Sequence, residues 1–219
     1  MDVREILAAV DHTLLSVTAT REEIVTLCQE AVEYGCAAVC VPPSYVALAK
    51  ACTQGEVSVC TVVGFPNGYS STAVKVFETE DAIRNGADEI DMVINIGWLK
   101  DRLFSDLLAE IKTVRAACKG KILKVIVETG LLTDDEKSRM CAIVSAAGAD
   151  YIKTGTGFSA GGAKPEDVAL FDRHKGPTLK IKAAGGIRTL EDAEEFLRLG
   201  ASRLGTSRIV KLVKEQGSI

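Results

Sequence analysis

Short apolar runs of strand length alternate with longer amphipathic stretches along the whole chain. Eight strands are predicted, and a helix-compatible stretch follows each of them, over residues 10–15, 36–41, 57–64, 88–95, 121–129, 150–154, 178–185 and 202–206. Helices are predicted over 72–85 and 133–147, and in the second Thr133 and Glu136 have the spacing of a capping box. This alternation of strands and helices is typical of a parallel sheet.

A glycine separates helix from strand at four similar junctions. These junctions read "EYGCAAVCV", "RNGADEIDMVIN", "AAGADYIKT" and "RLGASRLGT", and each glycine is predicted to end its helix with a positive φ. Eight such units in 219 residues favour an α/β fold of the (β/α)8 TIM-barrel type, with an open doubly wound sheet as the alternative. No change in composition marks a linker, so residues 1–219 are expected to form one domain.

Several strands carry charged residues at positions that alternate with apolar ones. Strand alternation directs Asp91, Lys124, Lys153, Lys180 and Lys182 toward the barrel axis. Strands six and seven are neighbours in a barrel, which predicts that Lys153 and Lys182 lie close together near the carboxyl ends, where barrel active sites are found. Two such ammonium groups would lower each other's pKa from about 10.4 toward about 7, and a neutral lysine attacks carbonyls. Simple pairing of each lysine with a carboxylate is the alternative.

Glycine-rich loops follow the last three predicted strands. They read "GTGFSAGG", "AAGGIRT" and "LGTSRI", and barrels commonly bind phosphate at these positions through backbone N–H groups and helix N-termini. The alternative is that the glycines only permit tight turns. "GTGFSAGG" does not match a dinucleotide fingerprint, because its third glycine is misplaced and no acidic residue follows at the required distance.

Composition excludes several classes of partner. With 26 basic and 30 acidic side chains, the net charge is -4 without a long run of one sign, so neither nucleic acid nor a membrane is expected as a partner. The start, "MDVREILAAV", lacks the features of a secretory signal, and we expect a cytoplasmic protein. Seven scattered cysteines and two histidines predict neither a disulfide framework nor a metal site.

Four sequence blocks together resemble one enzyme family. "GADEIDMVINIG", "KVIVETGLLTDDEK", "YIKTGTGFSAGGA" and "IKAAGGIRT" are similar to blocks of deoxyribose-phosphate aldolase, a class I aldolase with a (β/α)8 fold that needs no cofactor. The resemblance extends over nearly the whole chain, from "DHTLL" to "GASRLGTS". It implies cleavage of 2-deoxyribose 5-phosphate to glyceraldehyde 3-phosphate and acetaldehyde, and a homodimer or larger homo-oligomer.

The same resemblance implies the roles of individual residues. Lys153 would form the Schiff base, Asp91 would transfer protons, and Lys182 would assist both. The residues implied to bind the substrate or its phosphate are Gly157, Gly185, Gly186, Gly205, Ser207, Asp11 and Thr13. The chain departs from the family pattern at Gly155, where a serine or another small residue is usual. Two alternatives remain at this point, an aldolase for another sugar phosphate and a barrel that binds a phosphosugar without catalysis.

Overall fold

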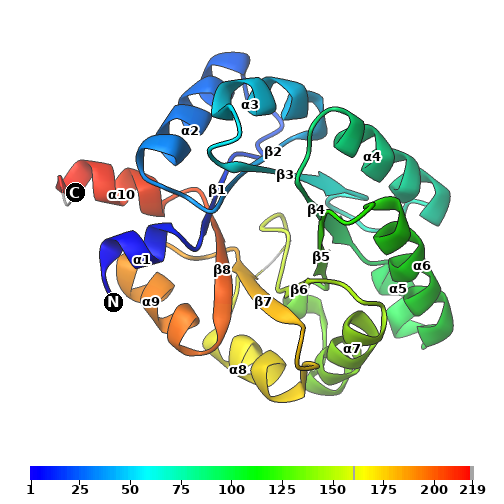
Figure 1. Ribbon diagram of the computed structural model, residues 1–219. Coiled ribbons are helices and arrows are strands. Elements are labelled where there is room, and N and C mark those ends of the chain that lie inside the picture. The colour runs from blue at the N-terminus through cyan, green and yellow to red at the C-terminus, as the bar shows by residue number, and fades with distance from the viewer. Residues whose placement is uncertain (160, 218–219) are drawn as a thin grey trace.

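Eight parallel strands close into a barrel in the computed structural model, which describes residues 1–159 and 161–217. Each strand pairs with its neighbours in the chain, and β8 pairs with β1 to complete the barrel (Figure 1). The predicted (β/α)8 fold is therefore confirmed, and the alternative of an open sheet is wrong. The strands are β1 (Val10–Thr13), β2 (Ala38–Val41), β3 (Ser58–Val63), β4 (Glu89–Val93), β5 (Ile122–Ile126), β6 (Tyr151–Lys153), β7 (Lys180–Ala184) and β8 (Ala201–Thr206).

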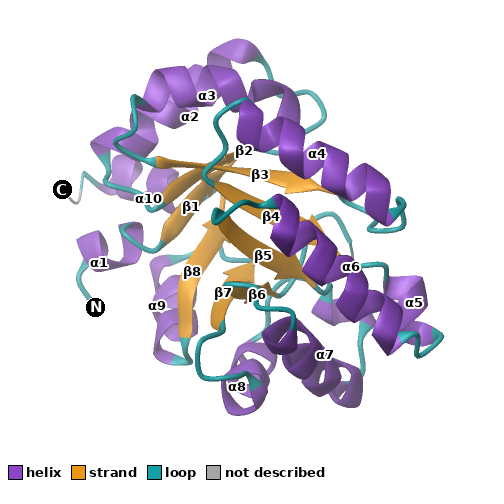
Figure 2. Ribbon diagram, turned by 45° about the vertical axis from the view of Figure 1, so that its right-hand side comes forward, coloured by secondary structure: helices purple, strands orange, loops and turns teal. Residues whose placement is uncertain are grey.

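Helices form a layer around the outside of the barrel (Figure 2). They are α1 (Val3–Leu7), α2 (Arg21–Glu33), α3 (Val46–Thr53), α4 (Thr72–Arg84), α5 (Ile96–Lys100), α6 (Phe104–Ala117), α7 (Asp134–Ala146), α8 (Pro165–His174), α9 (Leu190–Arg198) and α10 (Ile209–Gln216), with short 3-10 helices η1 (Pro43–Tyr45) and η2 (Thr129–Leu131). In the described part of the chain, no helix is both long enough and apolar enough to cross a membrane.

Local sequence signals set the ends of these elements. The four junction glycines have the predicted positive φ, with values of 63° at Gly35, 106° at Gly86, 72° at Gly148 and 106° at Gly200. Residues with a Cβ rarely adopt this conformation, so the glycines allow each helix to end and the chain to turn into the next strand. The capping box predicted for α7 is present, with Thr133 as its N-cap. For α4 the N-cap is Ser71, one residue before the predicted start.

Opposite faces of each strand meet different surroundings. On β4, Ile90 and Met92 point outward into the apolar layer that also contains Leu107 and Ile111 of α6. Burial of each such side chain stabilises the fold by about 1.5–3 kcal/mol. Asp91, between them, points to the barrel axis and has no exposed surface. The helix layer therefore holds the barrel together and leaves the inward positions available for chemistry.

Candidate active site

A cavity of about 400 Å³ lies at the carboxyl ends of the strands, among the loops that follow β1, β6, β7 and β8. This volume is within the range of small-molecule binding sites. Lys153, at the end of β6, lines the cavity and is 3% exposed. The predicted phosphate-binding residues also line it, namely Gly157, Gly185, Gly186, Gly205 and Ser207. The structure thus brings the lysine and the glycine-rich loops to one cavity, as the sequence predicted.

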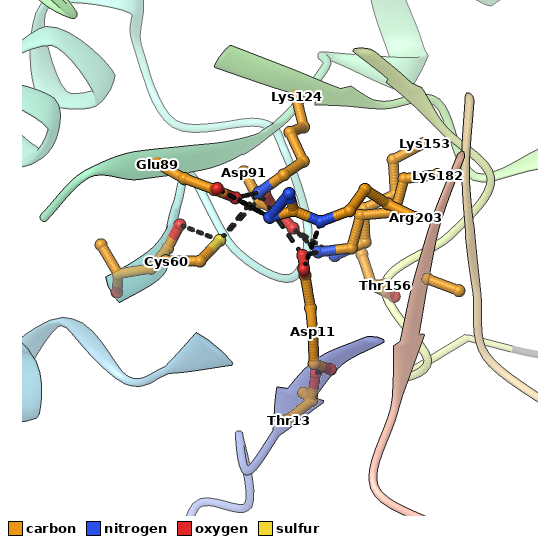
Figure 3. A network of polar contacts seen from close by, with 12 residues as sticks. Asp11, Thr13, Cys60, Glu89, Asp91, Lys124, Lys153, Thr156, Lys182 and Arg203 are labelled. Atoms are coloured by element: carbon orange, nitrogen blue, oxygen red, sulfur yellow. Dashed lines mark hydrogen bonds and ion pairs between the residues drawn. The ribbon is translucent and has the colours of Figure 1, made fainter. Parts of the chain in front are cut away.

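Asp91 holds Lys153 and Lys182 together. The two lysines are paired in register on β6 and β7. Each donates a hydrogen bond of 2.7 Å from its Nζ to the same oxygen, Oδ2 of Asp91 (Figure 3). The predicted proximity of the two lysines is confirmed, and each lysine also pairs with a carboxylate, as in the alternative considered from the sequence. Lys182 is fully buried beneath the cavity.

The predicted effect of the lysine pair on the pKa of Lys182 is wrong. Burial by itself would lower the pKa of Lys182, but the carboxylates of Asp11 and Asp91 outweigh burial and raise it above its usual range. Lys182 donates a 2.5 Å hydrogen bond to Oδ2 of Asp11 in addition to its bond to Asp91. Two anions therefore keep Lys182 protonated, and it acts as a fixed positive charge next to Lys153.

Asp91 is an unusually stabilised carboxylate. Burial would raise its pKa, but Lys124, Lys153 and Lys182 together hold the pKa well below its usual range. Its second oxygen, Oδ1, accepts a 2.8 Å hydrogen bond from Lys124 Nζ and a 3.1 Å bond from Cys60 Sγ. Asp91 therefore positions ammonium groups in the resting protein and is a weak proton acceptor there.

A second group of charges lies deeper in the barrel. Arg203 of β8 donates from Nε to Oδ1 of Asp11 at 2.7 Å, and from Nη2 to both carboxylate oxygens of Glu89 at 2.7 and 2.6 Å. Lys124 Nζ also pairs with Glu89 Oε2 at 2.6 Å. Sequence reasoning assigned no role to Arg203 or Glu89. Strand alternation could have found them, because Glu89 lies two residues before Asp91 and Arg203 two residues before Gly205.

The structure bears on two further predictions, the inward direction of Lys180 on β7 and the contact of Asp11 on β1 with the substrate. Lys180, expected in the interior, is exposed at the start of β7, where its Nζ lies 5.7 Å from the centre of the Tyr151 ring. Asp11 is fully buried and is not among the described residues that line the cavity. Burial would raise the pKa of Asp11, but Lys182, Lys124 and Arg203 hold it well below its usual range. Thr13 does line the cavity, and its hydroxyl donates to the backbone oxygen of Asp11 at 2.7 Å.

The glycines at the cavity serve two purposes. Gly157, Gly185 and Gly186 have φ of 81°, 86° and 77°, which lets the loops after β6 and β7 turn with their backbone toward the cavity. Gly205 has a different reason: a Cβ there would lie 2.9 Å from Cβ of Ala184 and 3.1 Å from Cε of Lys182. The missing side chain of Gly205 therefore leaves room for Ala184 and for the aliphatic part of Lys182.

Three further side chains at the cavity were missed by sequence reasoning. Thr156, Arg188 and Arg208 all line it, the last two on the glycine-rich loops after β7 and β8. The backbone N–H of Thr156 donates a 3.1 Å hydrogen bond to Oε2 of Glu128, and the Thr156 hydroxyl donates to the same oxygen at 2.6 Å. A Cβ at Gly155 would lie only 2.7 Å from Glu128 Oε1. The departure from the family pattern at Gly155 thus accommodates the buried Glu128 carboxylate.

Two cysteines, Cys40 and Cys60, also lie in the barrel interior. Cys40 and Cys60 face each other in register on β2 and β3, and both are fully buried. Within residues 1–159 and 161–217, two groups have ligand atoms close enough to hold a metal ion, Cys40 with Cys60 and Asp91, and Asp11 with Cys60 and Glu89. Their carboxylates already pair with lysine or arginine, so ammonium and guanidinium groups occupy the positions where a cation would bind.

Comparison with known proteins gives a consistent result. The family model of the DeoC/LacD family aldolases matches residues 5–207. A deoxyribose-phosphate aldolase from Streptococcus agalactiae is 56% identical over 216 residues, which cover 99% of this chain and 97% of that protein. A crystal structure described as a deoxyribose-phosphate aldolase from Coccidioides immitis superposes with a TM-score of 0.95 at 47% identity, covering 99% of this chain and 87% of the other. The tetrameric deoxyribose phosphate aldolase from Aeropyrum pernix has a TM-score of 0.88 at 30% identity, covering 99% and 93%.

Proposed function

The chain belongs to the DeoC/LacD family of aldolases, and we propose that it cleaves 2-deoxyribose 5-phosphate reversibly to glyceraldehyde 3-phosphate and acetaldehyde. The observation that carries this proposal is the placement of a lysine amine, Lys153, at the boundary between a buried ionic interior and a cavity lined by glycine-rich loops. An amine in this place can form a Schiff base with an aldehyde, and the loops can hold a phosphate at the other end of the same small molecule.

The first step is covalent. The neutral amine of Lys153 attacks C1 of the open-chain sugar, and the resulting carbinolamine loses water to form an iminium ion. When the Lys153 nitrogen is uncharged in the carbinolamine, Asp91 is left with two cationic partners, Lys124 and Lys182, and becomes a better proton acceptor. We therefore assign to Asp91 the positioning of Lys153 and the transient uptake of the amine proton as the carbinolamine forms. Asp91 then returns this proton to the departing hydroxyl, which leaves as water.

The second step breaks the bond between C2 and C3. Deprotonation of the 3-hydroxyl through water releases glyceraldehyde 3-phosphate, and the electron pair of the broken bond moves into the iminium to give an enamine. Protonation of C2 and hydrolysis then release acetaldehyde and restore Lys153. Asp91 and Lys182 are both fully buried, so they act through Lys153 or through water and not by direct contact with the sugar.

The phosphate end of the substrate has a separate set of partners. Backbone N–H groups of the loops at Gly157, Gly185 and Gly186, with Gly205 and the Ser207 hydroxyl, would bind the phosphate oxygens. Arg188 and Arg208 lie at the same cavity and add positive charge for a dianion. Thr13 would contact the sugar, and we assign Asp11 to holding Lys182 and not to the substrate.

Assembly and location follow from the same proposal. We infer a homo-oligomer, since one solved relative is described as a tetramer. A phosphorylated sugar does not cross membranes freely, so a substrate of this kind supports a cytoplasmic location.

The test is to trap the intermediate. The protein is incubated with acetaldehyde and sodium borohydride, and tryptic peptides are analysed by mass spectrometry. We expect a reduced two-carbon adduct on Lys153 in the wild type, no adduct in Lys153→Ala, and loss of cleavage of 2-deoxyribose 5-phosphate in that variant. Lys180→Ala is the matched control, because Lys180 lies on the neighbouring strand but is exposed outside the cavity. An adduct on another lysine, or full activity in Lys153→Ala, would refute the proposal.

A further inference from the structure

Six buried charged side chains form a closed ring of ion pairs inside the barrel (Figure 3). Each member pairs with the two members beside it in the ring, and Lys124 Nζ also lies 3.5 Å from Oδ2 of Asp11, across the ring. The order is Asp91, Lys182, Asp11, Arg203, Glu89, Lys124 and back to Asp91, with contacts of 2.7, 2.5, 2.7, 2.6, 2.6 and 2.8 Å in that order. The ring joins β4, β5, β7, β8 and β1 across the interior.

Lys153 is attached to this ring but is not a member of it. In the described part of the chain, its ammonium makes one ion pair, with Oδ2 of Asp91. The ring contains three cations and three carboxylates and is therefore neutral. A protonated Lys153 is a surplus positive charge in a buried site, whereas a neutral Lys153 leaves the interior balanced. Uncompensated charge is costly in a low-dielectric interior.

We propose that Arg203 and Glu89 are positioning residues that control the protonation of Lys153. They complete a ring of ion pairs that has no net charge, so the ammonium of Lys153 is a positive charge without a balancing anion. Neither residue lines the cavity, and neither contacts Lys153. The inference rests on the proposed function, because it concerns the amine that would attack the substrate.

The other ionisable groups near Lys153 are not replaced in these variants, although Arg203→Met also removes the guanidinium that lies 5.9 Å from the centre of the Tyr151 ring. Besides the ring, these groups are Cys40 on β2, Cys60 on β3, Glu128 after β5, Tyr151 on β6 and Lys180 at the start of β7. Glu128 is engaged with Thr156, and Lys180 is exposed. A comparison between ring variants therefore isolates the charge of the ring.

The charge count predicts shifts of opposite sign. Arg203→Met removes one cation, so that a protonated Lys153 now balances three carboxylates and holds its proton to higher pH. Glu89→Gln removes one anion, so that Lys153 loses its proton at lower pH. We expect the acidic limb of the pH–rate profile to move up by about one pH unit in the first variant and down by about one in the second. The double variant loses one charge of each sign and should return to the wild-type midpoint.

The experiment measures kcat/KM for cleavage of 2-deoxyribose 5-phosphate, and the rate of borohydride trapping with acetaldehyde, between pH 5 and 9. Arg203→Lys is the matched control, because it keeps the positive charge but loses the planar guanidinium. We expect this variant to have the wild-type midpoint of the pH–rate profile and a lower free energy of unfolding. Circular dichroism checks the fold, and if Arg203→Met does not fold, Glu89→Gln and the double variant still decide the question. Shifts in the same direction, no shifts, or a double variant that does not return to the wild-type midpoint would overturn the proposal.

The two proposals fail in distinguishable ways. If the wild type gives no reduced adduct on Lys153, both the proposed function and the role of the ring are refuted. If the wild type gives the adduct but the midpoints of Arg203→Met and Glu89→Gln do not separate, only the role of the ring is refuted.

Discussion

The barrel interior has two sectors with the same depth of burial and opposite chemistry. On β2 and β3 the inward residues are Ala38, Cys40, Cys60 and Val62, which form a small apolar cluster of their own. On β4 to β8 and β1 the inward residues include the charged side chains around Asp91. A barrel interior can thus be filled by small apolar side chains, so the charges of the second sector are not needed to fill space.

A gain in stability does not explain the presence of buried charges in the second sector either. Apolar replacement of a whole buried ion pair is often neutral or stabilising, because desolvation offsets most of the attraction. Removal of one partner is costly, because it leaves a buried charge alone. The charged sector therefore stabilises the fold only as a complete set, and this set lies next to Lys153, whose amine reaches the cavity. We therefore expect the charged sector to serve chemistry and the apolar sector to serve packing.

Lys182→Leu should have the largest effect. It removes the cation that pairs most closely with both Asp11 and Asp91, and we expect the free energy of unfolding to fall by about 3–5 kcal/mol. We also expect kcat/KM at pH 7 to fall by about 10²- to 10⁴-fold, because Lys182 is the fixed charge beside Lys153. Chemical denaturation and steady-state kinetics measure the two effects.

Val62→Ala in the apolar sector is the control for this prediction. It should lower stability by about 1–3 kcal/mol and change kcat/KM by less than threefold. Activity of Lys182→Leu within tenfold of the wild type would show that the charged sector is not specialised for chemistry.

Acid should weaken the charged sector selectively. Asp11 and Asp91 have pKa values well below the usual range, since their cationic partners outweigh the opposing effect of burial. Their stabilising contribution is thus complete above the unfolded-state pKa of about 3.9 and is lost as pH falls toward the lower folded-state values. The free energy of unfolding, measured in urea, should decrease below about pH 4, by about 1.4 kcal/mol per pH unit for each carboxylate.

A variant can assign this acid sensitivity to one carboxylate. Asp91→Asn should give a flatter dependence of stability on pH, although its stability at pH 7 is lower. Asp101→Asn, which replaces an exposed carboxylate after α5, should keep the wild-type slope. Equal slopes for the wild type and Asp91→Asn would mean that the charged sector does not determine acid stability.

Sequence reasoning succeeded where the signal is local. Strand alternation and the junction glycines, such as Gly86 and Gly148, predicted the barrel, and the same alternation predicted that Lys153 and Lys182 lie side by side. Strand alternation predicts on which face of the sheet a side chain lies, but it does not predict which side chain it contacts across the barrel interior. It therefore could not show that Arg203 of β8 bonds to Glu89 of β4 on the other side of the barrel.

The same limit explains the error about the lysine pair. Two lysines on neighbouring strands were expected to repel each other directly, but the side chain of Asp91 extends from β4 to a point between them. Asp11 reaches Lys182 from the other side. Which charges meet depends on the curvature and closure of the barrel, and these are properties of all eight strands together.

The smallest effect tests the boundary between the sectors, where Cys40 and Cys60 lie side by side. Both are fully buried, so Cys40→Ala and Cys60→Ala should each lower stability by about 1 kcal/mol. Burial raises the pKa of Cys60 well above its usual range, so Cys60 is a neutral thiol that donates to Asp91 Oδ1. Loss of a hydrogen bond to a charged group should therefore lower kcat by about three- to tenfold in Cys60→Ala, against less than twofold in Cys40→Ala. If kinetics and denaturation show the two variants to be equal in both respects, the thiol of Cys60 belongs to the apolar sector alone.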